Sequence, residues 1–182
     1  VHNAFEVIQN GGIILYPTDT VWGIGCDATN PEAIKKIYAL KQREESKSMI
    51  VLMNGEKMMY KVFKDIPEVA WQILDLSEKP TTLILDNPRN VAQNVIAEDK
   101  TLGVRIVKEP FCFKLMERMK KPLVSTSANI SGMFTPKSFK EIAPEIINGV
   151  DYVVNLHREK ICDKPSTIIK LTNDSQVTII RK

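Results

Sequence analysis

A short apolar run that passes directly into a polar loop constrains the fold of this chain more than any other stretch. Residues 13–16 (IILY) lie between a glycine pair and Pro17, a pattern typical of a strand buried on both faces. Residues 18–20 (TDT) follow, and Gly23 and Gly25 let the backbone approach another backbone or a ligand. Because open α/β sheets bind ligands at the carboxyl ends of their strands, this stretch predicts an α/β fold with a site here.

The next segment has the signals of a capped helix that ends in positive charge. Asn30 is a typical N-cap, Pro31 suits the first helical position, and the apolar spacing predicts a helix to about Lys41. Arg43 and Lys47 lie just beyond. These cations have two interpretations: they stabilise the negative end of the helix dipole, or they bind phosphate, with arginine making planar bidentate contacts. The polar loop nearby favours phosphate binding.

Apolar runs separated by turn signals extend this pattern over the whole chain. Residues 49–53 predict a second buried strand, joined to the first by a right-handed parallel crossover. Other strands are expected at residues 81–85, 103–107, 122–126, 152–155 and 177–180, with one more beginning after Pro165. Helices are expected at residues 3–11, 110–119 and 138–147, and over residues 58–76 with a break before Pro67. Within the stretch 58–76, the side chains expected in the core are those of residues 58, 59, 62, 69, 73 and 76. We therefore expect a single α/β domain over residues 1–182, with an open, twisted, mixed parallel and antiparallel sheet flanked by helices.

The strand predicted at residues 122–126 runs into a second polar loop. Residues 125–132 (STSANISG) combine five polar side chains with a terminal glycine. Such a loop forms either a turn held by local side-chain bonds or a cradle for phosphate or ribose. Its position directly after a buried strand favours the cradle.

These motifs together resemble the YrdC-type threonylcarbamoyl-AMP synthases. The resemblance rests on YPTDTVWGIG, ALKQR and STSANISG, in that order, and extends from about Gly12 to Arg181. It implies a YrdC-like fold with a concave basic cleft. It also implies a nucleotidyltransferase that makes threonylcarbamoyl-AMP and pyrophosphate from L-threonine, bicarbonate or carbon dioxide, and ATP, with Mg²⁺ bound to the ATP. The product would supply tRNA threonylcarbamoyladenosine modification through the proteins of a threonylcarbamoyl-transferase complex.

The same resemblance implies roles for individual residues. The L-threonine site is expected at Thr18, Thr20 and Thr167. Lys41 and Arg43 are the expected catalytic residues, which act by positioning and by neutralising phosphate charge. The nucleotide is expected to contact Lys41, Arg43, Lys47, Thr82, Arg105, Ser125, Ser127, Asn129, Ser166 and Arg181.

Some positions depart from the family pattern or allow two interpretations. Glu44 stands where the family commonly has proline, and residues 107–110 (VKEP) lack the histidine of the family's Pro-x-His-Pro run. Arg105 alternates with apolar neighbours in its expected strand, so it faces either solvent or the cleft. The resemblance favours the cleft.

Composition excludes several other classes of protein. With 43% hydrophobic and 26% charged residues, the chain matches an ordinary soluble protein, and no apolar run reaches membrane-spanning length. Residues 1–12 do not form a secretory signal, so we expect a cytoplasmic protein without a membrane partner. The 3 cysteines are widely spaced and the 2 histidines are isolated, which fits neither a disulfide framework, a zinc site nor a histidine-dependent triad.

Two other functions fit the same motifs. One is the carbamoyl-adenylate chemistry of hydrogenase-maturation proteins, in which a similar domain is part of a much longer chain. The other is a non-catalytic module that binds double-stranded RNA or tRNA through the basic cleft, although a net charge of +3 is mild for such a role. An enzyme releases pyrophosphate only with all three substrates, whereas a binding module shows salt-dependent RNA affinity without turnover.

Overall fold

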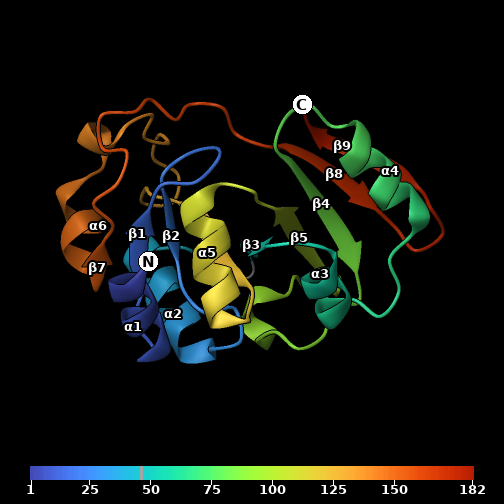
Figure 1. The fold of residues 1–182 in the computed structure, drawn as a ribbon, viewed down its shortest axis with the longest axis horizontal. Helices are drawn as coiled ribbons and strands as arrows, with labels where there is room; N and C mark the ends of the chain where they lie inside the picture. Colours follow the sequence, from blue (N-terminus) through green and yellow to red (C-terminus); the bar gives the residue numbers. More distant parts are fainter. Residues whose placement is uncertain (46) are drawn as a thin grey trace.

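A computed structural model describes residues 1–45 and 47–182, and in it the described strands form one open sheet that mixes parallel and antiparallel pairs (Figure 1). The spatial order is β7-β1-β2-β6-β3-β5-β4-β8-β9. The strands are β1 (Ile14–Tyr16), β2 (Gly23–Gly25), β3 (Ile50–Met53), β4 (Thr81–Asp86), β5 (Thr101–Ile106), β6 (Leu123–Ser127), β7 (Tyr152–Val153), β8 (Thr167–Leu171) and β9 (Val177–Arg181). The pairs β1/β7, β3/β5 and β4/β8 are parallel, and the remaining pairs are antiparallel. The expected mixed α/β sheet is confirmed.

Helices flank this sheet along its length. They are α1 (His2–Gln9), α2 (Pro31–Lys41), α3 (Glu56–Val62), α4 (Glu68–Leu76), α5 (Pro110–Met119) and α6 (Pro144–Gly149), with 3₁₀ turns at Gln93–Val95 and Phe139–Glu141. Figure 1 shows α5 crossing in front of the middle strands, α6 beside β7 and α4 beside β8 and β9. In the described residues, none of these helices has the length and apolar character needed to cross a bilayer.

The connection between β1 and β3 differs from the expected crossover. The predicted loop contains strand β2, which pairs antiparallel with β1, and both β2 and β6 lie between β1 and β3. A parallel βαβ unit from β1 to β3 is therefore wrong. Strand β2 was missed because two of its three residues are glycine, so it carries almost no apolar pattern.

Glycine is required in β2 because two other segments approach it closely. A Cβ atom at Gly25 would lie 2.7 Å from the Tyr16 ring and closer still to the carbonyl oxygen of Val124. Both neighbours are fully buried in the core, and the Tyr16 hydroxyl donates to that same carbonyl over 2.9 Å. This close approach allows β2 to fit between β1 and β6.

Local signals predicted most helices, and the exceptions have local causes. The Asn30 side chain accepts hydrogen bonds from the backbone N–H groups of Glu32 and Ala33, both over 3.1 Å, and α2 ends at Lys41 as predicted. The helix expected over residues 138–147 is instead a 3₁₀ turn and then α6, because Pro144 cannot donate within a helix and begins a new one.

The first helix and the core contain two smaller corrections. Helix α1 begins at His2, so Asn3 lies inside the helix and does not cap it. Leu76, which we expected in the core, is 83% exposed because it lies at the solvent-facing end of α4. The buried apolar side chains otherwise pack into one continuous cluster that includes all of β1.

Replacing Gly25 with alanine tests the close packing of β2. Gly25→Ala should lower the free energy of unfolding by about 3 kcal/mol, because the clash involves backbone that cannot move aside. Gly103→Ala is the matched control in β5, since the nearest atoms to its Cβ would lie 3.6 Å away. The control should change stability by less than about 1 kcal/mol in urea unfolding. Equal losses for both variants would contradict the packing of β2 described above.

Candidate functional site

A cavity of about 470 Å³ opens where the ends of several strands meet. Its volume is in the range of small-molecule sites. The lining includes residues of β5 and β6, the loop after β6 and the end of β9. It also includes the segment after β1 and the segments that lead into β3 and β8. The lining residues are Thr20, Val21, Arg43, Ser48, Met49, Ile50, Arg105, Ser125, Thr126, Ser127, Thr135, Pro136, Lys137, Asp163, Pro165, Ser166 and Arg181.

The cavity brings together about half of the residues predicted to form the site. Those in its lining are Thr20, Arg43, Arg105, Ser125, Ser127, Ser166 and Arg181. The others lie outside the lining: Thr18, Lys41, Lys47, Thr82, Asn129 and Thr167. The functional roles of both groups stay predictions.

Arg105 is buried and holds the loop that follows β1. Its Nη2 donates to Asp19 Oδ1 over 3.0 Å and to Thr20 Oγ1 over 3.3 Å. The Thr18 hydroxyl donates to the carbonyl of Val21 over 2.7 Å and accepts from the backbone N–H of Thr20. Of the two orientations considered for Arg105, the structure therefore has the one that faces the cavity.

The two expected catalytic cations have different surroundings. Arg43 lines the cavity, and its Nε and Nη2 donate to the carbonyls of Lys47 and Ser48, both over 2.8 Å. Lys41 is buried, and its Nζ donates to the carbonyls of Ser127 and Asn129. Burial, together with the nearby charge of Arg43, lowers the pKa of Lys41 to about 7.

Arg181 holds the segment that enters β8. Its Nε and Nη2 donate to the carbonyl oxygen of Ser166 over 2.9 and 2.7 Å. The Ser166 hydroxyl in turn lies 2.7 Å from Thr82 Oγ1, so Thr82 reaches the site through Ser166. Burial, and then the charge of Arg105, lower the pKa of Arg181.

Five polar residues of the lining were not predicted: Ser48, Thr126, Thr135, Lys137 and Asp163. Thr126 lies within STSANISG, Thr135 and Lys137 follow it closely, and Asp163 lies three residues before Ser166, so closeness in sequence to predicted site residues was the available signal. The backbone N–H of Cys162 donates to the carbonyl of Lys137 over 2.7 Å, which joins the two segments. No local pattern predicts this contact.

The lining contains more positive than negative charge. Its ionisable residues among those the structure describes are the cations Arg43, Arg105, Lys137 and Arg181 and the carboxylate Asp163. Such a lining suits a ligand that carries several negative charges. The concave basic cleft implied by the sequence stays a prediction beyond this local excess of cations.

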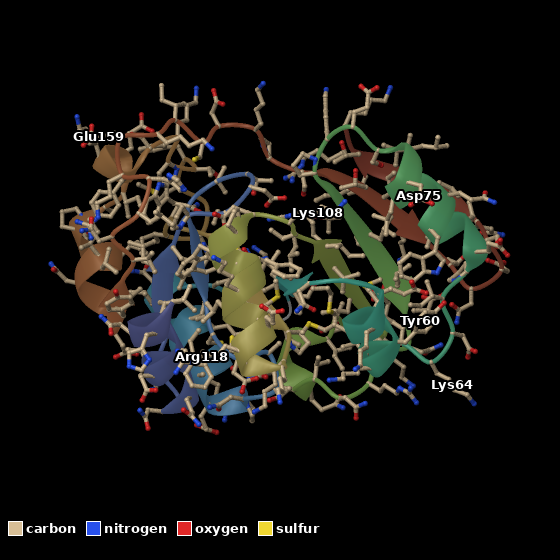
Figure 2. The ribbon with its side chains drawn as sticks, in the orientation of Figure 1. Tyr60, Lys64, Asp75, Lys108, Arg118 and Glu159 are labelled. Carbon is tan, nitrogen blue, oxygen red and sulfur yellow. The ribbon has the colours of Figure 1, made fainter. Side chains whose placement is uncertain are left out.

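Removing Asp19 tests whether the buried arginine depends on its partner. Asp19→Ala leaves the Arg105 guanidinium buried without a carboxylate and should cost about 3 kcal/mol of unfolding free energy. The control is Glu159→Ala, at the edge of the molecule in Figure 2, where the ion pair with Lys140 is exposed. Urea unfolding should show a loss of about 1 kcal/mol or less for the control. A loss as small for Asp19→Ala would mean that this pair contributes little to the fold.

Comparisons with known proteins agree with the fold and the motifs. The Sua5/YciO/YrdC family model, described as "Telomere recombination", matches residues 6–182. A putative threonylcarbamoyl-AMP synthase of Methanocaldococcus jannaschii is 35% identical over 173 residues, which cover 94% of this chain and 80% of that protein.

Solved structures of the same fold support this relationship. Sua5 of P. abyssi in complex with L-threonine matches with a TM-score of 0.81 and 26% identity, over 93% of this chain and 50% of that chain. YciO of E. coli matches with a TM-score of 0.85 and 26% identity, over 99% of this chain and 87% of that chain. This chain therefore spans about half the length of the Sua5 chain and most of YciO. Because the family model covers nearly all of its residues, the chain belongs to the Sua5/YciO/YrdC family.

Proposed function

We propose that this protein is an L-threonylcarbamoyladenylate synthase, a nucleotidyltransferase that uses L-threonine, bicarbonate or carbon dioxide, and ATP. The observation that carries the proposal is that one cavity collects Thr20, Arg43 and Ser127 from three separated motifs, together with Arg105 of β5. Hydroxyl groups and arginines in one enclosed space suit a small amino acid beside a polyphosphate. The name of the archaeal relative and the L-threonine bound to Sua5 support the same substrates.

The proposed reaction needs no nucleophile from the protein. The threonine amine adds to the carbon of carbon dioxide and loses a proton, which gives a carbamate. A carbamate oxygen then attacks the α-phosphorus of ATP, and the bond from that phosphorus to the oxygen bridging to the β-phosphate breaks. Pyrophosphate leaves with the electron pair of that bond, and threonylcarbamoyl-AMP remains. Catalysis then consists of positioning and of stabilising charge on the phosphates.

The roles proposed for the predicted residues divide between the amino acid and the nucleotide. We assign Thr20 to L-threonine, with Thr18 holding the loop in shape from behind through its bonds to Thr20 and Val21. Thr167 begins β8 beside Ser166 and is assigned to the same amino acid. We assign Arg43 and Lys47 to phosphate and the remaining predicted cavity residues to the nucleotide: Arg105, Ser125, Ser127, Ser166 and Arg181.

Mg²⁺ fits this site as a partner of the ATP phosphates. Protein sites usually hold Mg²⁺ through one or two carboxylates together with substrate phosphates. Among the described residues of the lining, Asp163 is the carboxylate that would hold it. The ion supplies positive charge that neutralises the departing pyrophosphate.

The proposed product determines what the protein works with. A mixed anhydride of a carbamate and AMP is an activated acyl group that a separate enzyme transfers. We therefore propose that the proteins of a threonylcarbamoyl-transferase complex receive it for modification of tRNA, in the cytoplasm. Direct contact with tRNA or double-stranded RNA is not needed for this chemistry.

Pyrophosphate release with each substrate omitted in turn tests the proposed reaction. Release should require L-threonine, bicarbonate and ATP together, and serine should replace threonine better than alanine does. A site that hydrogen-bonds a substrate hydroxyl leaves buried polar groups unpaired when the hydroxyl is missing. Equal release with alanine and threonine would refute this assignment. Salt-dependent RNA binding without pyrophosphate release would instead support the non-catalytic alternative.

Comparison of Arg43→Ala with Lys47→Ala tests the phosphate assignment. Arg43 lines the cavity, so its loss should reduce kcat/KM by about 10-fold to 150-fold, the value of a charge-assisted bond of about 1.5–3 kcal/mol. Lys47 is exposed outside the lining, so its replacement should have a smaller effect. Thermal unfolding of both variants is measured as well, because a lost phosphate contact leaves the unfolding temperature unchanged, whereas lost loop structure lowers it. The opposite order of activities would reject the assignment.

A further inference from the structure

Lys41 has an unusual environment for a lysine. It is the last residue of α2, it is 1% exposed, and it is outside the lining of the cavity. Its Nζ lies 2.7 Å from the carbonyl oxygen of Asn129 and 3.4 Å from Asn129 Oδ1, and it also donates to the carbonyl of Ser127. An ammonium group has three N–H donors, and these three oxygens use all of them. No donor of Lys41 is then directed at a ligand.

The loop after β6 is joined to the end of α2 in both directions. While the Lys41 side chain donates to the loop, the backbone N–H of Ser131 donates to the carbonyl of Lys41 over 2.8 Å. The Asn129 amide then donates to the carbonyls of Ile130 and Met133 over 3.1 and 2.9 Å. Ser127, at the start of the loop, lines the cavity itself. The shape of this part of the cavity therefore depends on where Lys41 holds the loop.

Burying this ammonium is costly, and the chain compensates with oxygens of the loop alone. No ion pair among the described residues includes Lys41, and burial and Arg43 both act against its positive charge. An apolar side chain would fill the same space without that cost. What an apolar side chain cannot do is act as a donor that holds the carbonyls of Ser127 and Asn129 in one place.

We propose that Lys41 is a positioning residue, which acts through the carbonyls of Ser127 and Asn129 to shape the part of the cavity that receives the nucleoside. Arg43, which lines the cavity, then meets the phosphates. This proposal rests on the function proposed above, and it replaces the phosphate contact that the sequence implied for Lys41. It separates the two cations of the ALKQR motif into Lys41, which only shapes the site, and Arg43, which also touches the ligand.

The test compares ligands that differ only in phosphate. Adenosine, ATP and pyrophosphate are titrated by calorimetry into the unaltered protein, Lys41→Met and Arg43→Gln. Lys41→Met should weaken the binding of adenosine and of ATP by the same factor, about tenfold or more, and leave the affinity for pyrophosphate unchanged. Arg43→Gln should weaken the binding of ATP and of pyrophosphate and leave the affinity for adenosine unchanged. Lys35→Met is the matched control, because Lys35 lies on the same helix with its side chain 56% exposed. This control variant should bind all three ligands with the affinity of the unaltered protein.

A second variant keeps the inference testable if Lys41→Met does not fold. Lys41→Arg keeps the positive charge. If residue 41 contacted phosphate directly, this variant would therefore retain its affinity for ATP. If Lys41 instead positions the loop, Lys41→Arg should lose ATP affinity, because the larger planar guanidinium does not fit three oxygens already arranged around an ammonium. Adenosine and ATP affinity should therefore again fall together.

Hydrogen exchange supplies a readout of the loop itself. Amides of residues 127–133 should exchange faster in Lys41→Met than in Lys35→Met, with β1 and β5 unchanged. Reduced ATP affinity with normal adenosine affinity and normal exchange would overturn the inference and leave the proposed function standing. An unaltered protein that neither binds ATP nor releases pyrophosphate would overturn the proposed function itself.

Discussion

Hydrogen bonds from four cations to loop oxygens hold the cavity together. Lys41 donates to the loop after β6, Arg43 to the segment before β3, and Arg181 to the segment before β8. Arg105 does the same for the loop after β1 through Asp19 and Thr20. Each of these segments connects helices or strands, so regular backbone pairing alone does not fix its shape. Arg43, Arg105 and Arg181 also line the cavity, so charges that suit a polyphosphate help to hold its walls, whereas Lys41 only holds them.

The sheet order explains why segments so distant in sequence meet at this cavity. Strand β6 lies between β2 and β3, so the loop after it faces both the loop after β1 and the segment before β3. The narrow fit of β2 is a condition for that arrangement, since Gly25 is in close contact with Tyr16 and Val124. Strand β5 then brings Arg105 beside β3, with its register partner at Leu52.

Features with a local cause were predictable from the sequence, and features with a distant cause were not. The cap at Asn30 and the end of α2 at Lys41 depend on neighbouring residues, and both were predicted correctly. Strand β2 depends on close approach to Tyr16 and Val124, which no periodicity in three residues expresses. The burial of Lys41 and the contact between Cys162 and Lys137 depend on how separate segments pack. The resemblance identified most of the polar cavity residues because it combined separated motifs, but it did not distinguish residues that line the cavity from residues that support it.

A crystal structure of this protein with a non-hydrolysable ATP analogue and L-threonine bound tests the central claim most directly. The nucleotide should occupy the cavity with its phosphates at Arg43, and Lys41 Nζ should remain on the carbonyls of Ser127 and Asn129 as it is without ligand. The threonine hydroxyl should lie at the loop that contains Thr20. A nucleotide bound elsewhere, or a Lys41 ammonium that has left the loop for a phosphate, would contradict the distinction between Lys41, which only shapes the site, and Arg43, which binds the ligand.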